Sequence, residues 1–239
     1  MGTLVIVTGG SAGFGRAVLA RAPVGAQLVD ISRSGAAEAG VHVAADLADP
    51  ASWPRVGEAL AGLVAEAGYE RITFVHSAGT LDPIGFAGEV EHHAATRNVL
   101  LNSAAPQVLG HAFLAAVASL DARRELVLVS SGAARTAYPG WSTYGAGKAA
   151  CDQWVRTVGL EQRERGGVRV LAVAPGVLAT GMQATIRATD ARDFPQVDRF
   201  RDLHASGRLV DPEDAADRLW RLLDDDTVPS GSVTDLRDR

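Results

Sequence analysis

Thr8-Gly9-Gly10-Ser11-Ala12-Gly13-Phe14-Gly15 is the stretch of sequence that decides the fold. It follows the apolar run 4–7, which is typical of a buried strand, and it precedes the helix-forming stretch 16–21. Glycines let a backbone approach a pyrophosphate closely, and the free N–H groups of a helix N-terminus stabilise the negative charge of that ligand. A flexible loop is the simpler alternative, but the position between a strand and a helix favours a dinucleotide site.

Apolar runs alternate with alanine-rich helical stretches along the rest of the chain, which is the pattern of a parallel sheet covered on both faces. Strands are predicted at residues 3–7, 27–31, 41–44, 71–75, 125–129, 168–173 and 232–236. Helices are predicted at residues 51–67, 96–119, 142–165 and 212–223, the last with Asp211 as its N-cap before a proline. We therefore expect one α/β domain over residues 1–239, a doubly wound, seven-stranded Rossmann fold with an insertion at 181–207.

The composition limits the possible classes of protein. With 239 residues, 47% hydrophobic and 21% charged, the chain can bury one substantial core. Its net charge of -5 argues against general binding to nucleic acid or to an anionic membrane, so small acidic ligands must be held by local groups. The single cysteine, Cys151, excludes an intramolecular disulfide, and we expect it to be a packing residue.

The sequence also predicts where the protein works. We expect no membrane span, because no run approaches the ~20 consecutive apolar residues that a bilayer requires. The first predicted strand begins almost at once after Met1, which leaves no room for a signal peptide. A cytoplasmic location is therefore expected.

Tyr144 and Lys148 stand four residues apart in the predicted helix 142–165, and Ser131 follows the apolar run 126–129. A helix advances about 3.6 residues per turn, so residues at i and i+4 share one face. An ammonium group beside a phenol stabilises the phenolate, which lets the phenol donate a proton more readily. Such a pair also occurs by chance on solvated helices, so its weight comes from its combination with the glycine-rich turn.

The chain resembles the short-chain dehydrogenase/reductase family over nearly its whole length. Five motifs in the right order carry this resemblance. They are the glycine signature at Thr8, Gly9, Gly13 and Gly15, the helix asparagine at Asn102, the catalytic serine at Ser131, the YxxxK pair at Tyr144 and Lys148, and the PG signature with a following threonine at Pro175, Gly176 and Thr180.

The resemblance implies a catalytic role for Ser131, Tyr144, Lys148 and Asn102. Tyr144 would protonate a carbonyl oxygen as hydride reaches its carbon, and Ser131 would hydrogen-bond the same oxygen. Lys148 would assist Tyr144 and hold the nicotinamide ribose, while Asn102 would place a water that connects Lys148 to solvent. Alternatively, Asn102 only satisfies a helix kink.

The resemblance also implies a set of residues that contact the dinucleotide. These are Gly9, Ser11, Gly13, Phe14, Gly15, Ser32, Arg33, Asp46, Leu47, Ser77, Ala78, Gly79, Tyr144, Lys148, Pro175, Gly176, Val177 and Thr180. Two have alternative interpretations: Asp46 could simply cap a turn, and Thr180 could cap the helix that follows it. The motif at 76–79 departs from the family, because His76-Ser77-Ala78-Gly79 replaces Asn-Asn-Ala-Gly. We expect no acid/base role for His76.

The end of the second predicted strand favours NADPH over NADH. NAD-dependent relatives usually carry an acidic residue where this chain has Ser32. Arg33 can instead pair a 2′-phosphate, with Ser32 and Ser34 as additional donors. Asp30 would repel a phosphate if it faced the site, but we expect it to lie within the strand.

One branch of the family, the benzil reductases and their sepiapterin reductase relatives, is the most similar to the region after Thr180. This resemblance implies an NADPH-dependent carbonyl reductase that acts on an aryl ketone or a 1,2-diketone. Tyr138, Trp141, Met182 and Phe194 could form an apolar substrate pocket above Tyr144, or they could only pack the 181–207 insertion against the sheet.

Two other functions remain open: a dehydrogenase of another secondary alcohol or a sugar, and a non-catalytic dinucleotide sensor. The expected partner is a small carbonyl substrate. A homodimer, or a tetramer, is expected through helices 96–119 and 142–165, where Ala104, Ala115, Ala149 and Gly159 would permit close packing. No metal is expected, because His92, His93 and the other histidines lack companions at metal-ligand spacing.

Overall fold

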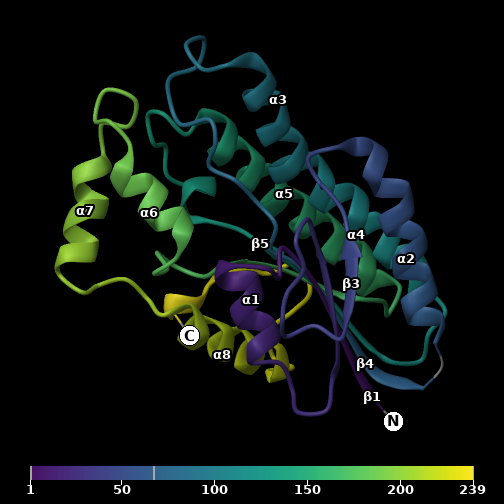
Figure 1. The fold of residues 1–239 in the computed structure, drawn as a ribbon. Helices are drawn as coiled ribbons and strands as arrows, with labels where there is room; N and C mark the ends of the chain where they lie inside the picture. Colours follow the sequence, from purple (N-terminus) through teal and green to yellow (C-terminus); the bar gives the residue numbers. More distant parts are fainter. Residues whose placement is uncertain (1, 67, 239) are drawn as a thin grey trace.

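The computed structural model describes residues 2–66 and 68–238. Its centre is one parallel seven-stranded sheet with the strand order β3-β2-β1-β4-β5-β6-β7 (Figure 1). The strands are β1 (Gly2–Thr8), β2 (Gln27–Ser32), β3 (Val41–Ala44), β4 (Tyr69–His76), β5 (Arg123–Val129), β6 (Arg169–Ala174) and β7 (Val233–Asp235). The predicted fold class and its seven strands are confirmed. The chain order reverses between β1 and β4, so this is where a ligand crevice is expected at the carboxyl ends.

Helices cover both faces of the sheet because the side chains of each central strand alternate between them. Leu4 and Ile6 of β1 pack with α2, α4 and α5, whereas Val5 and Val7 pack with α1 and α8 (Figure 1). The α-helices are α1 (Gly13–Ala20), α2 (Trp53–Ala65), α3 (His92–Val99), α4 (Ala105–Ala116), α5 (Ser142–Glu164), α6 (Gly181–Ala188), α7 (Val197–Ala205) and α8 (Pro212–Asp224).

The helix predicted at 96–119 differs from the observed one. It begins earlier, at His92, because the Glu91 carboxylate accepts hydrogen bonds from the backbone N–H groups of His93 and Ala94. A π-helical turn, Leu100–Ala104, separates α3 from α4. The helix predicted at 51–67 ends at Ala67, which lies outside the described residues. The first and last residues of the expected domain, 1 and 239, also lie outside them.

The strandless segment 181–207 contains α6 and α7. Its Ile186, Phe194 and Phe200 form a small apolar cluster with Trp141 and Tyr144, which lie at the start of α5. Figure 1 shows both helices at one end of the molecule, beyond the sheet. This segment therefore forms a wall beside the helix that carries Tyr144.

One stretch of the described residues, 92–116, is long and apolar enough to cross a membrane by length and composition alone. The expectation of no membrane span rested on a different criterion, an unbroken run of about 20 apolar residues. The stretch 92–116 is weak evidence for a membrane span, because core helices of other proteins meet the same criterion. Here α4 buries Leu109 and Phe113 in the core beneath the sheet.

Gly159 does not lie on an open helix face, which corrects its expected role in subunit packing. It is buried, and a Cβ placed on it would lie 2.1 Å from the Cα atom of Gly231. Helix α5 and the turn before β7 are thus in backbone contact. The absence of a Cβ atom at Gly159 allows this close packing within the chain.

His76 ends β4 and is buried with no hydrogen-bond partner for either ring nitrogen among the described residues. Its ring lies edge-on to Phe74 at a centroid distance of 6.4 Å. Burial, assisted by the positive charge of Lys148, lowers the pKa of His76 to about 3. The imidazole is therefore neutral in the folded protein at physiological pH.

Gly159→Ala should lower the free energy of unfolding by about 1–3 kcal/mol, because the added methyl group must displace the backbone of Gly231. Gly62→Ala is the matched control, since Gly62 lies in α2 with open space around it. That change should raise the free energy of unfolding by about 0.5–1 kcal/mol. Urea denaturation of both variants measures the difference, and equal effects would contradict the packing described.

The low pKa of His76 predicts an acid-sensitive fold. The unfolded chain binds a proton near pH 6.5 and the folded chain only near pH 3, so this stability is present above pH 6.5 and lost as the pH falls towards 3. Between pH 7 and pH 5 the wild type should lose about 2 kcal/mol more than His76→Asn does. Urea denaturation at both pH values measures this, with the exposed His111→Asn as control. Identical losses in the wild type and His76→Asn would contradict the burial.

Candidate active site

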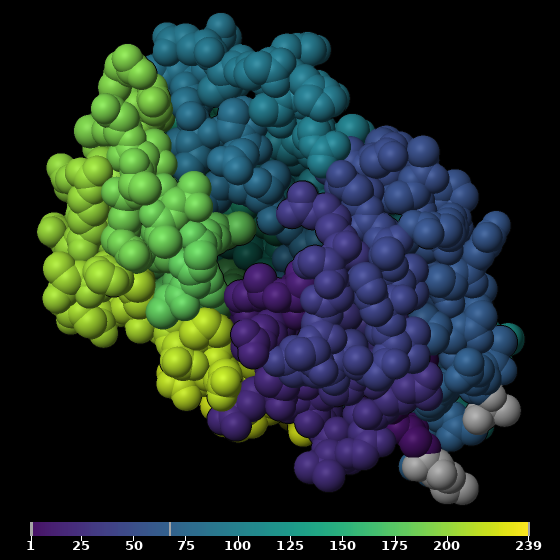
Figure 2. Space-filling view, viewed as in Figure 1, coloured from purple at the N-terminus to yellow at the C-terminus, as the bar shows by residue number. Residues whose placement is uncertain are grey.

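One cavity of about 590 Å³ opens at the carboxyl ends of the strands. Figure 2 shows the hollow between the purple N-terminal segment and the green 181–207 segment, with teal residues at its floor. Its walls come from the glycine-rich turn, from the ends of β2, β4, β5 and β6, from the start of α5, and from α6 and α7. The expected cofactor residues other than Gly15, and the expected substrate residues Tyr138, Trp141 and Met182, line this one space.

The glycine-rich turn fits a pyrophosphate. A Cβ on Gly9 would lie 2.9 Å from the Cα atom of Ala78, and a Cβ on Gly15 would lie 2.4 Å from the carbonyl oxygen of Gly9. These contacts require glycine, because the turn packs directly against the end of β4 and against its own helix. Helix α1 begins at Gly13 without a side-chain cap, so the N–H groups of its first turn can bind an anion.

The end of β2 is organised by Asp30, which is fully buried. Its carboxylate accepts hydrogen bonds from the Gly10 N–H at 2.8 Å and from the Ser32 hydroxyl at 2.6 Å. Asp30 therefore lies within the strand, as expected, and does not line the cavity. The expected donor role of Ser32 is corrected, because its hydroxyl hydrogen is already given to Asp30.

Arg33 and Ser34 are exposed at the cavity wall beyond Ser32. Arg33 interacts electrostatically with Asp46, which also lines the cavity. The Asp46 carboxylate pairs with Arg97 at 2.7 Å and accepts a hydrogen bond from the Ala48 N–H at 3.0 Å. In this part of the cavity lining, Arg33 is thus the cationic side chain, and the Asp46 carboxylate is its acidic neighbour.

Ser131, Tyr144 and Lys148 meet at the floor of the cavity. The Lys148 ammonium donates to the carbonyl oxygen of Val129 at 2.7 Å and lies 5.9 Å from the centroid of the Tyr144 ring. Both side chains are nearly buried, with 5% and 7% exposure. Ser131 follows two residues after Val129, and its hydroxyl accepts a hydrogen bond from the Ala133 N–H. The end of β5 thus holds all three side chains together.

Asn102 is close to this group but does not line the cavity. Its amide donates to the Thr80 carbonyl and to the Asn98 side chain, and its oxygen accepts from the Thr80 N–H. A Cβ on Gly79 would lie 2.8 Å from the Asn102 oxygen and 3.6 Å from the Lys148 nitrogen. The side chain of Asn102 therefore fixes the loop after β4 from within the π-helical turn and, in the described part of the chain, does not bond to the backbone of that turn, as the helix-kink alternative would require.

The segment after β6 forms the opposite wall. Gly176 has a φ of 93°, and Pro175, Val177 and Thr180 line the cavity beside it. Thr180 precedes α6 but makes no side-chain capping hydrogen bond. Its side chain instead faces the glycine-rich turn, because a Cβ on Gly13 would lie 3.5 Å from the Thr180 methyl group. The capping alternative for Thr180 is not supported.

The remaining predicted cofactor residues, Ser11, Phe14, Leu47 and Ser77, also line the cavity, as do the predicted substrate residues Tyr138, Trp141 and Met182. Phe194 does not. It is buried behind Trp141 and stacks on it at 4.5 Å and 12°, so its expected place in the pocket was wrong. Both interpretations of the aromatic residues thus hold in part.

Sequence reasoning missed several side chains that line the cavity: Leu81, Arg135, Gln183, Ile186, Arg199, Phe200, Asp235 and Arg237. They come from separate parts of the chain, and no spacing pattern joins them. Among the described residues, no group of three or more His, Cys, Asp and Glu side chains is arranged to hold a metal.

Comparisons with known proteins agree with this geometry. Residues 3–191 match the short chain dehydrogenase family. The benzil reductase ((S)-benzoin forming) of Bacillus subtilis (strain 168) is 37% identical over 171 residues, which cover 71% of this chain and 70% of the relative. The sepiapterin reductase of Meriones unguiculatus is 33% identical over 255 residues, which cover 98% of this chain and 95% of the relative.

Solved structures share the fold. The crystal structure of the KRED1-Pglu enzyme superimposes with a TM-score of 0.83 at 27% identity, over 97% of this chain and all of the other (100%). An ElxO variant with NADPH bound superimposes with a TM-score of 0.78 at 21% identity, over 99% of this chain and 97% of the other. The second likeness concerns the fold alone. By the family match, the relatives and the geometry of the cavity, this chain belongs to the short-chain dehydrogenase/reductase family.

Proposed function

We propose that this protein is an NADPH-dependent carbonyl reductase that converts an aryl ketone or a 1,2-diketone of the benzil type into a hydroxy ketone or alcohol. The observation that carries the proposal is the meeting of Ser131, Tyr144 and Lys148 in the cavity that also contains the glycine-rich turn. A proton donor and an anion-binding turn in one space are what a hydride-transfer enzyme requires.

The residues of the cavity fit the cofactor. The glycine-rich turn and the N-terminus of α1 would bind the pyrophosphate, and Arg33 would pair the 2′-phosphate. Lys148 would hold the nicotinamide ribose, and the segment from Val177 to Thr180 would orient the carboxamide. NADPH, when bound, supplies the hydride.

Side chains of this protein would stabilise and neutralise the negative charge that develops on the substrate oxygen. Tyr144 would donate its proton to that oxygen, and Ser131 would hydrogen-bond the same atom. Lys148, held by Val129, would stabilise the phenolate that Tyr144 leaves behind. Asn102 would act as a positioning residue, since its side chain fixes the backbone beside Gly79 and Lys148.

The benzil-like substrate rests on two observations. The relative from Bacillus subtilis is a benzil reductase, and the cavity has an aromatic wall of Tyr138 and Trp141 beside Tyr144. Flat aryl carbonyl compounds suit such a wall. We further propose that the segment 181–207 is a lid over this substrate and that the protein acts in the cytoplasm.

Tyr144→Phe should lower turnover of benzil by at least about 10²–10⁴-fold, because the proton donor is lost. Binding of NADPH, measured by its fluorescence, should change little. Tyr69→Phe is the matched control, since Tyr69 lies at the other end of the sheet and bonds to Gln27. Near-normal turnover of Tyr144→Phe would refute the assignment of Tyr144 as the proton donor. A wild type that binds NADPH but turns over no carbonyl compound and no alcohol would favour a dinucleotide sensor.

Arg33→Ala should reduce the preference for NADPH over NADH by about ten- to hundredfold, because a charge-assisted pair with the 2′-phosphate is lost. Values of kcat/KM with each cofactor measure the preference. Arg165→Ala removes the same charge at the far end of α5 and should leave it unchanged. Equal preferences in Arg33→Ala and the wild type would reject NADPH selection by this residue.

We also propose a homodimer formed through the outer faces of α4 and α5. Val108 and Leu160 are exposed there, beside a groove that contains Trp154. Light scattering at micromolar concentration should give the mass of two chains, and Leu160→Glu should shift it towards one. A wild type with the mass of a single chain would contradict the dimer, and a mass of four chains would indicate the tetramer.

A further inference from the structure

The cavity is positively charged although the protein is acidic overall. Its cationic lining residues are Arg33, Arg135, Lys148, Arg199 and Arg237, and its carboxylates are Asp46 and Asp235. The net charge of the chain is -5, so this excess of cations is local. A concave surface of one charge concentrates ligands of the opposite charge.

Two of these cations have roles in the proposed function. Arg33 lies near Asp46 at the expected adenosine side, and Lys148 is held beneath Tyr144. Of the other three, Arg135 and Arg237 share the carboxylate of Asp235, whereas Arg199 forms no ion pair with it. The cavity therefore holds more positive charge than the cofactor's binding residues account for.

Asp235 is buried and already satisfied by Arg237. The Arg237 guanidinium donates to both carboxylate oxygens, at 2.9 and 2.6 Å, and Arg135 lies 3.8 Å from one of them. This pair holds the pKa of the Asp235 carboxyl below its usual range. Asp235 is thus unsuited to bind a positively charged substrate group, and the sign of the site is set by the arginines.

Among the described residues, Arg199 is the one of these three arginines that pairs with no carboxylate. Among the described residues it makes no ion pair within 4.0 Å, and it donates one hydrogen bond, at 3.3 Å, to the Tyr138 hydroxyl. Its guanidinium also lies 5.9 Å from the centroid of the Tyr138 ring. A guanidinium offers a planar fork of donors that matches a carboxylate, and one contact to Tyr138 leaves that fork available.

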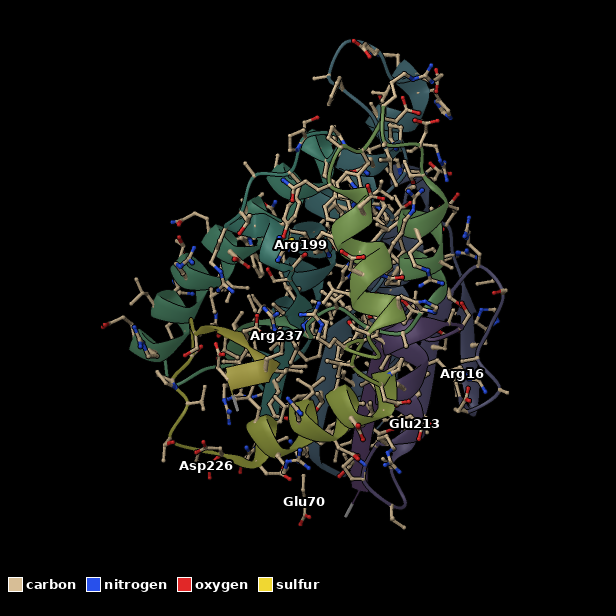
Figure 3. The ribbon with its side chains drawn as sticks, turned by 90° about the vertical axis from the view of Figure 1, so that its left-hand side faces the viewer. Arg16, Glu70, Arg199, Glu213, Asp226 and Arg237 are labelled. Carbon is tan, nitrogen blue, oxygen red and sulfur yellow. The ribbon has the colours of Figure 1, made fainter. Side chains whose placement is uncertain are left out.

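Tyr138 connects Arg199 with the Asp235 cluster. It contacts Arg199 directly and interacts electrostatically with Arg237. Figure 3 shows Arg199 on the 181–207 segment and Arg237 near the C-terminal end on the same face of the molecule, and both line the cavity. The same wall carries Trp141 and Phe200, so an aromatic surface adjoins the positive charge.

We propose that the substrate is an aryl carbonyl compound that carries a carboxylate, and that Arg199 is the specificity-determining residue that binds this acid beside Tyr138. This inference rests on the proposed function and names its substrate class. The aromatic wall would hold the ring, and Arg135 and Arg237 would add long-range attraction. Binding would also join the 181–207 segment to Tyr138 through the ligand.

The test compares an acid with its uncharged amide, which has nearly the same shape. 4-Carboxybenzil and 4-carbamoylbenzil serve as substrates. 4-Benzylbenzoate and 4-benzylbenzamide, which have no ketone, serve as ligands for calorimetry with NADPH present. The wild type should have a kcat/KM about tenfold or more higher for the acid substrate than for the amide substrate, through a lower KM. Its Kd for the acid ligand should be lower than its Kd for the amide ligand by a similar factor, because a charge-assisted pair stabilises the bound acid.

Arg199→Gln should reduce both preferences to about one, because the values for the acids should fall far more than the values for the amides. Arg199→Lys should keep part of the preference. Arg208→Gln is the matched control, because it removes the same charge after α7 and, among the described residues, its guanidinium hydrogen-bonds Ser206 and does not line the cavity. That variant should retain the full preference.

Equal affinity of the wild type for acid and amide would overturn the inference, and so would a preference that survives in Arg199→Gln. Failure of the proposed function has a different signature. Absence of turnover with every benzil, together with Arg199-dependent binding of 4-benzylbenzoate, would refute the reaction and support the anion site.

Discussion

The hydrogen bond from the Lys148 ammonium to the Val129 carbonyl is the constraint on which the site depends. It ties α5 to the end of β5, and so it holds the buried Lys148 ammonium 5.9 Å from the centroid of the Tyr144 ring, in the cavity that Ser131 also lines. A buried ammonium is costly unless nearby groups compensate its charge. In the proposed reaction the buried charge has a function, because it stabilises the phenolate that Tyr144 would become.

Two buried polar side chains beside the cavity, Asp30 and Asn102, hold its backbone in place. Asp30 joins the glycine-rich turn to β2, and Asn102 joins the π-helical turn to the loop after β4. Satisfied polar groups in a core specify one arrangement, because leaving any of them unpaired costs free energy. The glycine-rich turn and the loop beside Lys148 are thus each held in one arrangement.

The strands, the doubly wound sheet and the cavity floor could be predicted because they follow from local patterns: apolar runs, required glycines, and the helical spacing of Tyr144 and Lys148. The π-helical turn could not, since it depends on hydrogen bonds between Asn102 and a distant loop. The commitment of the Ser32 hydroxyl to Asp30, and the arginines around Asp235, likewise arise from tertiary contacts. Such contacts join residues that no spacing in the sequence relates.

The central claim is that Tyr144 and Lys148 act as one unit, and a double-variant cycle tests it most directly. Single-turnover rates of hydride transfer at saturating NADPH would be measured for Tyr144→Phe, Lys148→Met and the variant with both changes. Residues that act as a unit show losses far from additive, so the double variant should be about as slow as the slower single one. Losses that multiply would show that the two side chains act independently and would contradict the account.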